Sequence, residues 1–109
     1  MTLYWRADSA VVEDYTIFLH LAAADGFVQA QRDTPPVFGF YPTSSWQSDE
    51  IVADMHCLQL PPGLASGQYD LITGLYNPET GERLLLAGSE DNALLLGHVQ
   101  LVKAASGAS

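Results

Sequence analysis

The stretch Gly67–Leu86, with the sequence GQYDLITGLYNPETGERLLL, decides the fold class of this chain. Two runs of strand-forming residues flank a turn in which Pro78 presets φ and Gly81 supplies a left-handed backbone position. Polar and apolar residues alternate in the first run, and the second run ends in consecutive apolar residues. Both patterns are compatible with strands. The pattern therefore predicts a β-hairpin whose arms are residues 68–76 and 82–87.

Short strands are expected on both sides of this hairpin. Period-2 patterns separated by turn residues predict them at residues 3–7, 14–21, 27–32, 50–60 and 92–102. In the second of these, residues 15, 17, 19 and 21 share the more apolar face, and His20 falls on the other face with residues 16 and 18. No segment sustains the i, i+3, i+4, i+7 spacing and the capping residues of a helix.

The start of the 68–76 strand gives a further clue to topology. Tyr69 follows a corner that contains Gly67, which is the setting of a tyrosine corner, where the phenol bonds back to the backbone. The alternative is a plain core tyrosine, and both interpretations make Tyr69 structural. We therefore expect an all-β fold: an immunoglobulin-like (Greek-key) antiparallel β-sandwich of about seven strands, with residues 1–103 as one domain and 104–109 as a disordered tail.

Charge and composition exclude several classes of partner. The 109 residues are 48% apolar, and 13 acidic against 4 basic residues give a net charge of −9. Such a surface repels nucleic acid and anionic lipid, so we expect neither as a partner. The sequence shows neither a signal-peptide pattern nor an apolar run long enough to cross a bilayer. Cys57, the one cysteine, is in phase with Ile51, Ala53 and Met55, and we expect it to be a buried thiol.

A series of short motifs runs in one order along nearly the whole chain. The motifs are Leu3-Tyr4-Trp5-Arg6-Ala7, Asp14-Tyr15-Thr16-Ile17-Phe18-Leu19-His20-Leu21, Gln31-Arg32-Asp33 with Pro35-Pro36, Tyr41-Pro42-Thr43-Ser44-Ser45-Trp46, Glu50-Ile51-Val52-Ala53-Asp54, Gly67-Gln68-Tyr69 and Gly74-Leu75-Tyr76-Asn77-Pro78-Glu79-Thr80-Gly81-Glu82-Arg83-Leu84. Together they resemble the C-terminal extracytoplasmic β-sandwich of bacterial multi-spanning membrane proteins of the polyprenyl-phosphate-mannose-type glycosyltransferase kind.

The resemblance implies an accessory role. In that family the transferase chemistry belongs to the membrane-embedded part, so no catalytic residue carries over to this chain. The resemblance also implies a preceding strand that ends in a Pro-Gly turn, so the chain is expected to be an excised piece that lacks one edge strand. An unpaired edge predicts strand-addition dimers.

The longest connection, residues 33–49, is the candidate binding region. Loops of this length are often functional. Aromatic faces and short hydroxyls together suit a sugar ring, and the expected ligand-binding residues are Asp33, Tyr41, Thr43, Ser44 and Trp46. The alternative is that these aromatics cap the end of the sandwich.

Metal sites and catalysis find less support in the sequence. Asp33, Asp49 and Glu50 flank the long loop but lack calcium-loop spacing, and Asp33 or Asp54 is expected to bond loop amides or Arg32 instead. His20, His56 and His98 fall on three strands, which makes a poor zinc site, although His20 and His56 would be neighbours if their strands paired. No catalytic motif is present, so no metal, cofactor or enzymatic activity is expected.

The expected function is that of a non-catalytic extracytoplasmic module of a membrane glycosyltransferase-like protein. It would pack on the membrane-embedded part of its parent chain or hold a glycan or acceptor there. The alternatives are a free-standing carbohydrate-binding or adhesion module, and a structural spacer without a ligand. Exposure of an aromatic pair among Trp5, Tyr41 and Trp46 would favour glycan binding, and burial of all three would exclude it.

Overall fold

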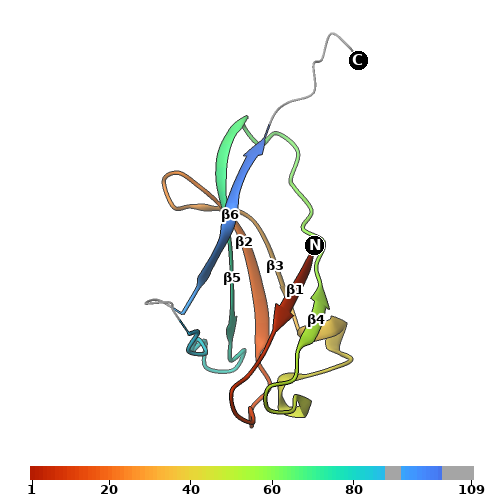
Figure 1. Ribbon diagram of the computed structural model, residues 1–109. Helices are drawn as coiled ribbons and strands as arrows, with labels where there is room; N and C mark the ends of the chain where they lie inside the picture. The colour runs from red at the N-terminus through yellow and green to blue at the C-terminus, as the bar shows by residue number, and fades with distance from the viewer. Residues whose placement is uncertain (88–91, 102–109) are drawn as a thin grey trace.

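The computed structural model describes residues 1–87 and 92–101 as two antiparallel β-sheets (Figure 1). In chain order the elements are β1 (Thr2–Trp5), β2 (Thr16–Ala23), β3 (Val28–Thr34), the 3-10 turns η1 (Pro36–Gly39) and η2 (Thr43–Ser45), β4 (Val52–Met55), β5 (Gly67–Tyr76) and β6 (Leu94–Leu101). The all-β class expected from the sequence is confirmed. The expected tail, 104–109, lies outside the described residues.

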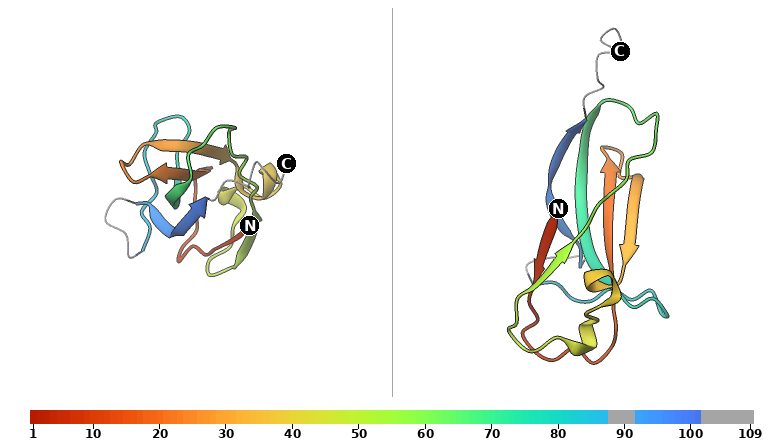
Figure 2. Two further views of the ribbon diagram at one scale, coloured as in Figure 1. Left: turned by 90° about the horizontal axis from the view of Figure 1, so that it is seen from above. Right: turned by 90° about the vertical axis from the view of Figure 1, so that its right-hand side faces the viewer.

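The two sheets differ in size. The large sheet has the order β3-β2-β5-β6, and the small sheet consists of β1 and β4. Every pairing is antiparallel, and the two views of Figure 2 show the small sheet lying against one face of the large one. In the large sheet β2 and β5 are neighbours, although β3 and β4 lie between them in the sequence. The chain passes through the small sheet at β4 before it returns to the large sheet at β5.

The core lies between the sheets and is formed by one face of β2 and β5. Ile17, Leu19 and Leu21 are at most 2% exposed, and Leu71 and Leu75 face them from β5. They divide into two clusters, one that includes Ala30 and Tyr69 and one that includes Trp46 and Val52. Full burial of each such aliphatic side chain contributes about 1.5–3 kcal/mol. The apolar face expected of β2 is confirmed.

The outer face of the large sheet also buries one aromatic side chain. Phe18 is 2% exposed because the Arg83 guanidinium lies 4.7 Å above its ring and the His20 ring lies 4.7 Å to one side. Its cross-strand partner is Gly74, and a Cβ on that glycine would lie 2.5 Å from the ring. The glycine therefore provides the space that Phe18 occupies.

Two turns at the ends of β5 have the geometry expected from their sequences. At its start, the Tyr69 hydroxyl donates a hydrogen bond of 2.6 Å to the Ala65 carbonyl, as a tyrosine corner requires. At its end, the turn containing Pro78 closes with the Gly81 N–H donating to the Asn77 carbonyl at 2.7 Å, and Gly81 has a φ of +78°.

Two expected strands differ from the structure. The return arm 82–87 is not a strand: one isolated bridge joins Tyr76 to Arg83, and β5 pairs with β6 instead. The expected strand 50–60 is reduced to β4, since β1 offers it only four partners. The described residues hold six strands, where about seven were expected.

The facing of β4 is the reverse of the expected one. Val52, Asp54 and His56 point into the core, whereas Met55 and Cys57 are exposed. The expected buried thiol was therefore wrong. The physical reason is that the buried polar side chains bond to each other and that the Asp54 carboxylate also accepts the Val37 N–H at 2.7 Å. Asp54 thus bonds a loop amide, as the sequence suggested.

Candidate functional site

The aromatic loop 33–49 is held by an internal side-chain bond and by several bonds to neighbouring segments. Trp46 is 7% exposed, and its indole N–H donates to the Tyr41 carbonyl at 3.0 Å. Thr43 is fully buried, and its hydroxyl donates to the Glu13 carbonyl at 2.6 Å while accepting the Tyr15 N–H at 3.0 Å. These contacts fasten the loop to the end of the sandwich, which is what the capping interpretation requires.

The remaining residues of the predicted site are dispersed. The Ser44 N–H donates to the Asp14 carboxylate at 3.0 Å, and this bond together with the Ser44 hydroxyl lowers the pKa of Asp14. Asp33 lies on the outer face of the large sheet, where it accepts the Tyr76 hydroxyl at 2.9 Å. The structure therefore brings Tyr41, Thr43 and Trp46 together but not Asp33.

The Tyr41 hydroxyl is also engaged. It donates to the Glu50 carboxylate at 2.6 Å, and the Gln47 N–H donates to the same oxygen at 3.0 Å. The Tyr41 bond lowers the pKa of Glu50 and raises the pKa of Tyr41 itself. These bonds close the loop that follows η2, so the phenol of Tyr41 has a structural role in that loop.

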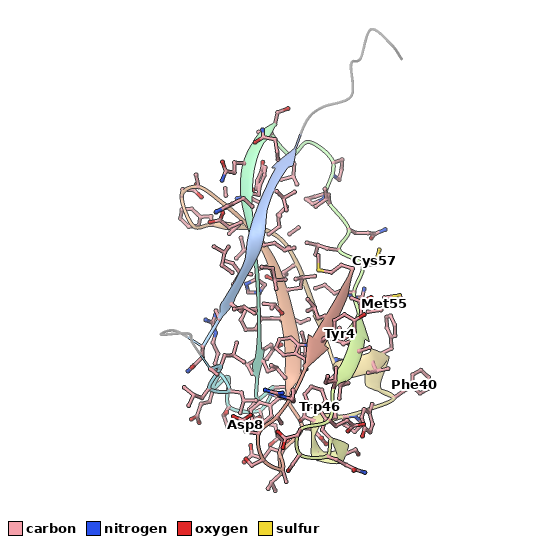
Figure 3. The ribbon with its side chains drawn as sticks, viewed as in Figure 1. Tyr4, Asp8, Phe40, Trp46, Met55 and Cys57 are labelled. Atoms are coloured by element: carbon pink, nitrogen blue, oxygen red, sulfur yellow. The ribbon has the colours of Figure 1, made fainter. Side chains whose placement is uncertain are left out.

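A cleft of about 490 Å³ at the same end of the molecule was not foreseen from the sequence. Its lining includes Trp5, Arg6, Asp8, Ser9, Trp46 and Leu85. Figure 3 shows Asp8 and Trp46 at this end of the molecule, below the small sheet. The cleft combines two indoles and leucine side chains with one guanidinium, one carboxylate and one hydroxyl.

Four separate segments build this cleft, which we call the tryptophan cleft, and one of them is Leu75 of β5. Trp5 ends β1, and the chain then leaves the sheet through Arg6 and Asp8; the Asp49 N–H fixes this turn by donating to the Ala7 carbonyl at 2.8 Å. Trp46 follows η2, and residues 84–86 come from the arm that was expected to be a strand. The only sequence signal was Trp5 next to a polar run.

One polar atom of Trp5 has no partner among the described residues. The indole nitrogen of Trp5 is buried without a hydrogen bond to any residue that the structure describes. A buried, unpaired donor costs about 1–3 kcal/mol relative to a satisfied one. A ligand or a water molecule that accepted this N–H would recover that cost.

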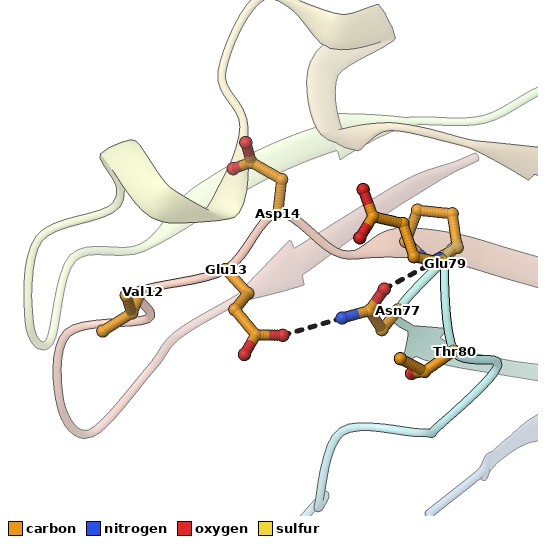
Figure 4. Close-up of a pocket in the computed structure, with 7 residues that line it drawn as sticks. Val12, Glu13, Asp14, Asn77, Glu79 and Thr80 are labelled. Carbon is orange, nitrogen blue, oxygen red and sulfur yellow. Dashed lines mark hydrogen bonds between the residues drawn. The ribbon is translucent and has the colours of Figure 1, made fainter.

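A second cleft, of about 550 Å³, lies beside the tip of the 76–83 turn (Figure 4). The Asn77 side chain joins two of the segments that line this cleft. Its amide donates to the Glu13 carboxylate at 2.7 Å, and its oxygen accepts the backbone N–H of Glu79 at 2.8 Å. Within residues 1–87 and 92–101, no three His, Cys, Asp or Glu side chains converge as a metal site.

The three histidines lie in three separate pairs with aspartates. His56 pairs with buried Asp54, whereas His98 contacts exposed Asp70 at 2.6 Å, and His20 lies 3.9 Å from Asp33. Burial lowers the pKa of His20, and Asp33 opposes that shift. The strands expected to carry His20 and His56 do not pair, because β2 and β4 belong to different sheets, so the condition for these two histidines to be neighbours is not met.

Comparisons with models of known protein families, with curated proteins and with solved structures found no match. Among the residues described, no helix has the length and apolar character needed to cross a bilayer.

Proposed function

We propose that this domain is a non-catalytic binding module that holds a neutral glycan in the tryptophan cleft. The observation that carries the proposal is that the half-buried Trp5 lines one cavity with the exposed Arg6 and Asp8, while Trp46, at 7% exposed, adds little surface to it. A sugar ring needs an aromatic surface for its C–H face and charged or amide groups for its hydroxyls.

The charge of the protein favours a neutral ligand. A net charge of −9 opposes the approach of phosphorylated or carboxylated saccharides. Asp8 and Arg6, which are both exposed, offer an acceptor and a donor of opposite charge. A pair of this kind matches the mixed donors and acceptors of an uncharged polyol.

The cleft supports binding better than hydrolysis. Among the described residues that line it, Asp8 is the one carboxylate. Hydrolysis of a glycosidic bond generally uses two carboxylates placed on either side of that bond. We therefore assign the cleft to recognition.

The biological setting of the module remains part of the proposal. We place it on the extracytoplasmic face of a bacterial membrane, attached to a glycosyltransferase-like parent, on the resemblance of its motifs. An immunoglobulin-like topology agrees with the strand order of the large sheet and with the Tyr69–Ala65 bond. A free-standing carbohydrate-binding module would use the same cleft, and a spacer would not use it.

The test is an NMR titration of the labelled protein with a panel of neutral mono- and oligosaccharides, following both indole N–H signals. We expect saturable shifts that are largest at Trp5. Asp8→Ala should weaken binding about tenfold, since a hydrogen bond to a charged group contributes about 1.5–3 kcal/mol. Glu79→Ala is the matched control, because it removes an exposed carboxylate outside the tryptophan cleft.

The outcome separates binding from structural support. Saturable shifts that Asp8→Ala weakens and Glu79→Ala does not would establish the cleft as the site. If no signal moved up to millimolar sugar in the folded protein, glycan binding would be excluded and the spacer role would replace it.

A further inference from the structure

The strand edges of the two sheets are protected unequally. In the large sheet, β3 carries the extra residue Gln29 and β6 carries the extra residue Leu96, and each interrupts the register with its neighbour. Such bulges are a common means of preventing an edge from pairing with another chain. In the small sheet, β4 points the carboxylate of Asp54 inward, where η1 contacts it through the Val37 N–H.

By contrast, nothing within residues 1–87 and 92–101 gives the β1 edge such protection. Its four residues, Thr2–Trp5, include no charge, proline or glycine, and their register with β4 is continuous. Among the described residues, β1 pairs with β4 alone. A short, regular, uncharged edge is the kind that accepts an additional strand.

The backbone groups that face away from β4 can be identified from the ladder. Met1 and His56 exchange both hydrogen bonds, at 3.0 and 2.7 Å. In an antiparallel pair, residues that exchange both bonds alternate with residues that exchange none. Thr2 and Tyr4 therefore direct their N–H and C=O groups to the free edge of β1.

An apolar groove runs beside this edge. Its volume is about 240 Å³, and Leu3 and Trp5 of β1 line it together with Leu94 and Leu96 of β6, with buried Thr73 from β5. Leu94 is 43% exposed. A strand paired with Thr2 and Tyr4 would place alternate side chains in this groove, because side chains of a strand alternate between its two faces.

We propose that the β1 edge is a strand-addition site for an extended peptide segment with apolar residues at alternate positions and no net negative charge. The backbone pattern specifies an extended chain, and the leucines and tryptophan of the groove specify apolar inward side chains. The charge of −9 carried by each copy opposes a second copy of this protein and favours a neutral or basic segment. A third strand would also stabilise a sheet that is marginal with two.

The probe is a synthetic peptide of about six residues in which valine and lysine alternate. Its control is the same peptide with N-methyl groups on the amides that would face β1, which keeps charge and composition but removes the donors. Hydrogen exchange of the protein amides is followed by NMR. We expect the unmodified peptide to protect the Thr2 and Tyr4 amides, and N-methylation to weaken binding about tenfold.

A pair of protein variants tests the groove separately. Leu94→Lys places a charge among the groove side chains and should abolish protection of the Thr2 and Tyr4 amides. Val12→Lys is the control, because Val12 is also exposed, at 87%, and lies outside the groove. Circular dichroism shows whether both variants fold. If Leu94→Lys does not fold, the comparison of the two peptides on the unaltered protein still tests the proposal.

The possible results decide the proposal. Protection by the unmodified peptide alone supports strand addition at β1. Absence of protection at millimolar peptide, or equal protection by both peptides, overturns it. Protection that rises with protein concentration without peptide, together with a dimer in analytical ultracentrifugation, assigns the edge to a second copy and overturns the proposed partner. None of these readouts depends on sugar binding, so the two proposals fail independently.

Discussion

The two sheets of this protein are stabilised in different ways. The large sheet contributes Ile17, Leu19 and Leu75 to the core, so cross-strand apolar packing stabilises it. The small sheet places two polar side chains, Asp54 and His56, on its inner face and exposes Tyr4 and Met55 on its outer face. Removing either member of the buried polar pair leaves the other without its partner, so a polar substitution there should cost more than one in an exposed polar pair of the large sheet.

The largest expected effect breaks the buried polar pair. Asp54→Ala removes the acceptor of both the Val37 N–H and His56, and leaves buried polar groups unpaired. We expect the free energy of unfolding in urea to fall by about 3 kcal/mol. The large sheet supplies a matched control, since Asp70→Ala removes an exposed partner of His98 and should cost less than about 1 kcal/mol. Equal effects of the two substitutions would contradict the contrast between the sheets.

The second effect probes packing in the large sheet. In Gly74→Ala the new Cβ would lie 2.5 Å from the Phe18 ring and 2.9 Å from the Asn92 carbonyl oxygen. Overpacking of this kind should lower the free energy of unfolding by about 1–3 kcal/mol. Gly97→Ala is the control, because no atom lies within 4 Å of the added carbon. A neutral Gly74→Ala would show that the outer face of the sheet adjusts more freely than its contacts suggest.

A smaller effect is expected at the corner that leads into β5. Tyr69→Phe keeps the buried ring and removes the hydrogen bond to the Ala65 carbonyl. Thermal or urea unfolding should register a loss of about 1 kcal/mol. Tyr4→Phe, at a side chain 71% exposed, should change stability little. If both variants had the same free energy of unfolding, the hydrogen bond from Tyr69 to Ala65 would make no net contribution to stability.

The smallest effect is a change in titration. Because Tyr41 donates to Glu50, the pKa of Glu50 lies below its ordinary value of 4.5. The contribution of this bond to stability is present above that ordinary value and is lost as pH falls through the lowered pKa. Tyr41→Phe should raise the pKa of Glu50, measured by NMR titration of its side-chain carboxyl carbon. An unchanged midpoint would assign the shift to the Gln47 N–H alone.

The sequence predicted the large sheet better than the small one. Alternation identified the buried face of β2 because apolar side chains alone decide it. The same reasoning assigned the wrong face to β4, because mutual hydrogen bonds made Asp54 and His56 compatible with burial. Periodicity carries no information about such partners, since Val37 is 17 residues distant in the chain.

The candidate site was predicted only in part. The sequence placed Trp46 at the end of the sandwich. It did not predict that Asp8 and Leu85, which lie far from Trp46 in the sequence, would line the same cleft. Residues 84–86 look like a strand because three leucines follow a tight turn. Arg83 bridges Tyr76 and the Leu84 N–H donates to the Leu75 carbonyl at 2.9 Å, but this ladder does not continue through residues 85 and 86, although the pairing of β5 with β6 ends at Thr73.

Trp5 lines both the tryptophan cleft and the groove at the β1 edge. One indole therefore lines two cavities, and a displacement of its ring changes the shape of both. Any occupant that shifts this ring changes the affinity of the opposite cavity by a factor that must be equal in both directions. The indole N–H signal of Trp5, resolved by NMR from that of Trp46, would thus report on two binding events and on the energetic coupling between them.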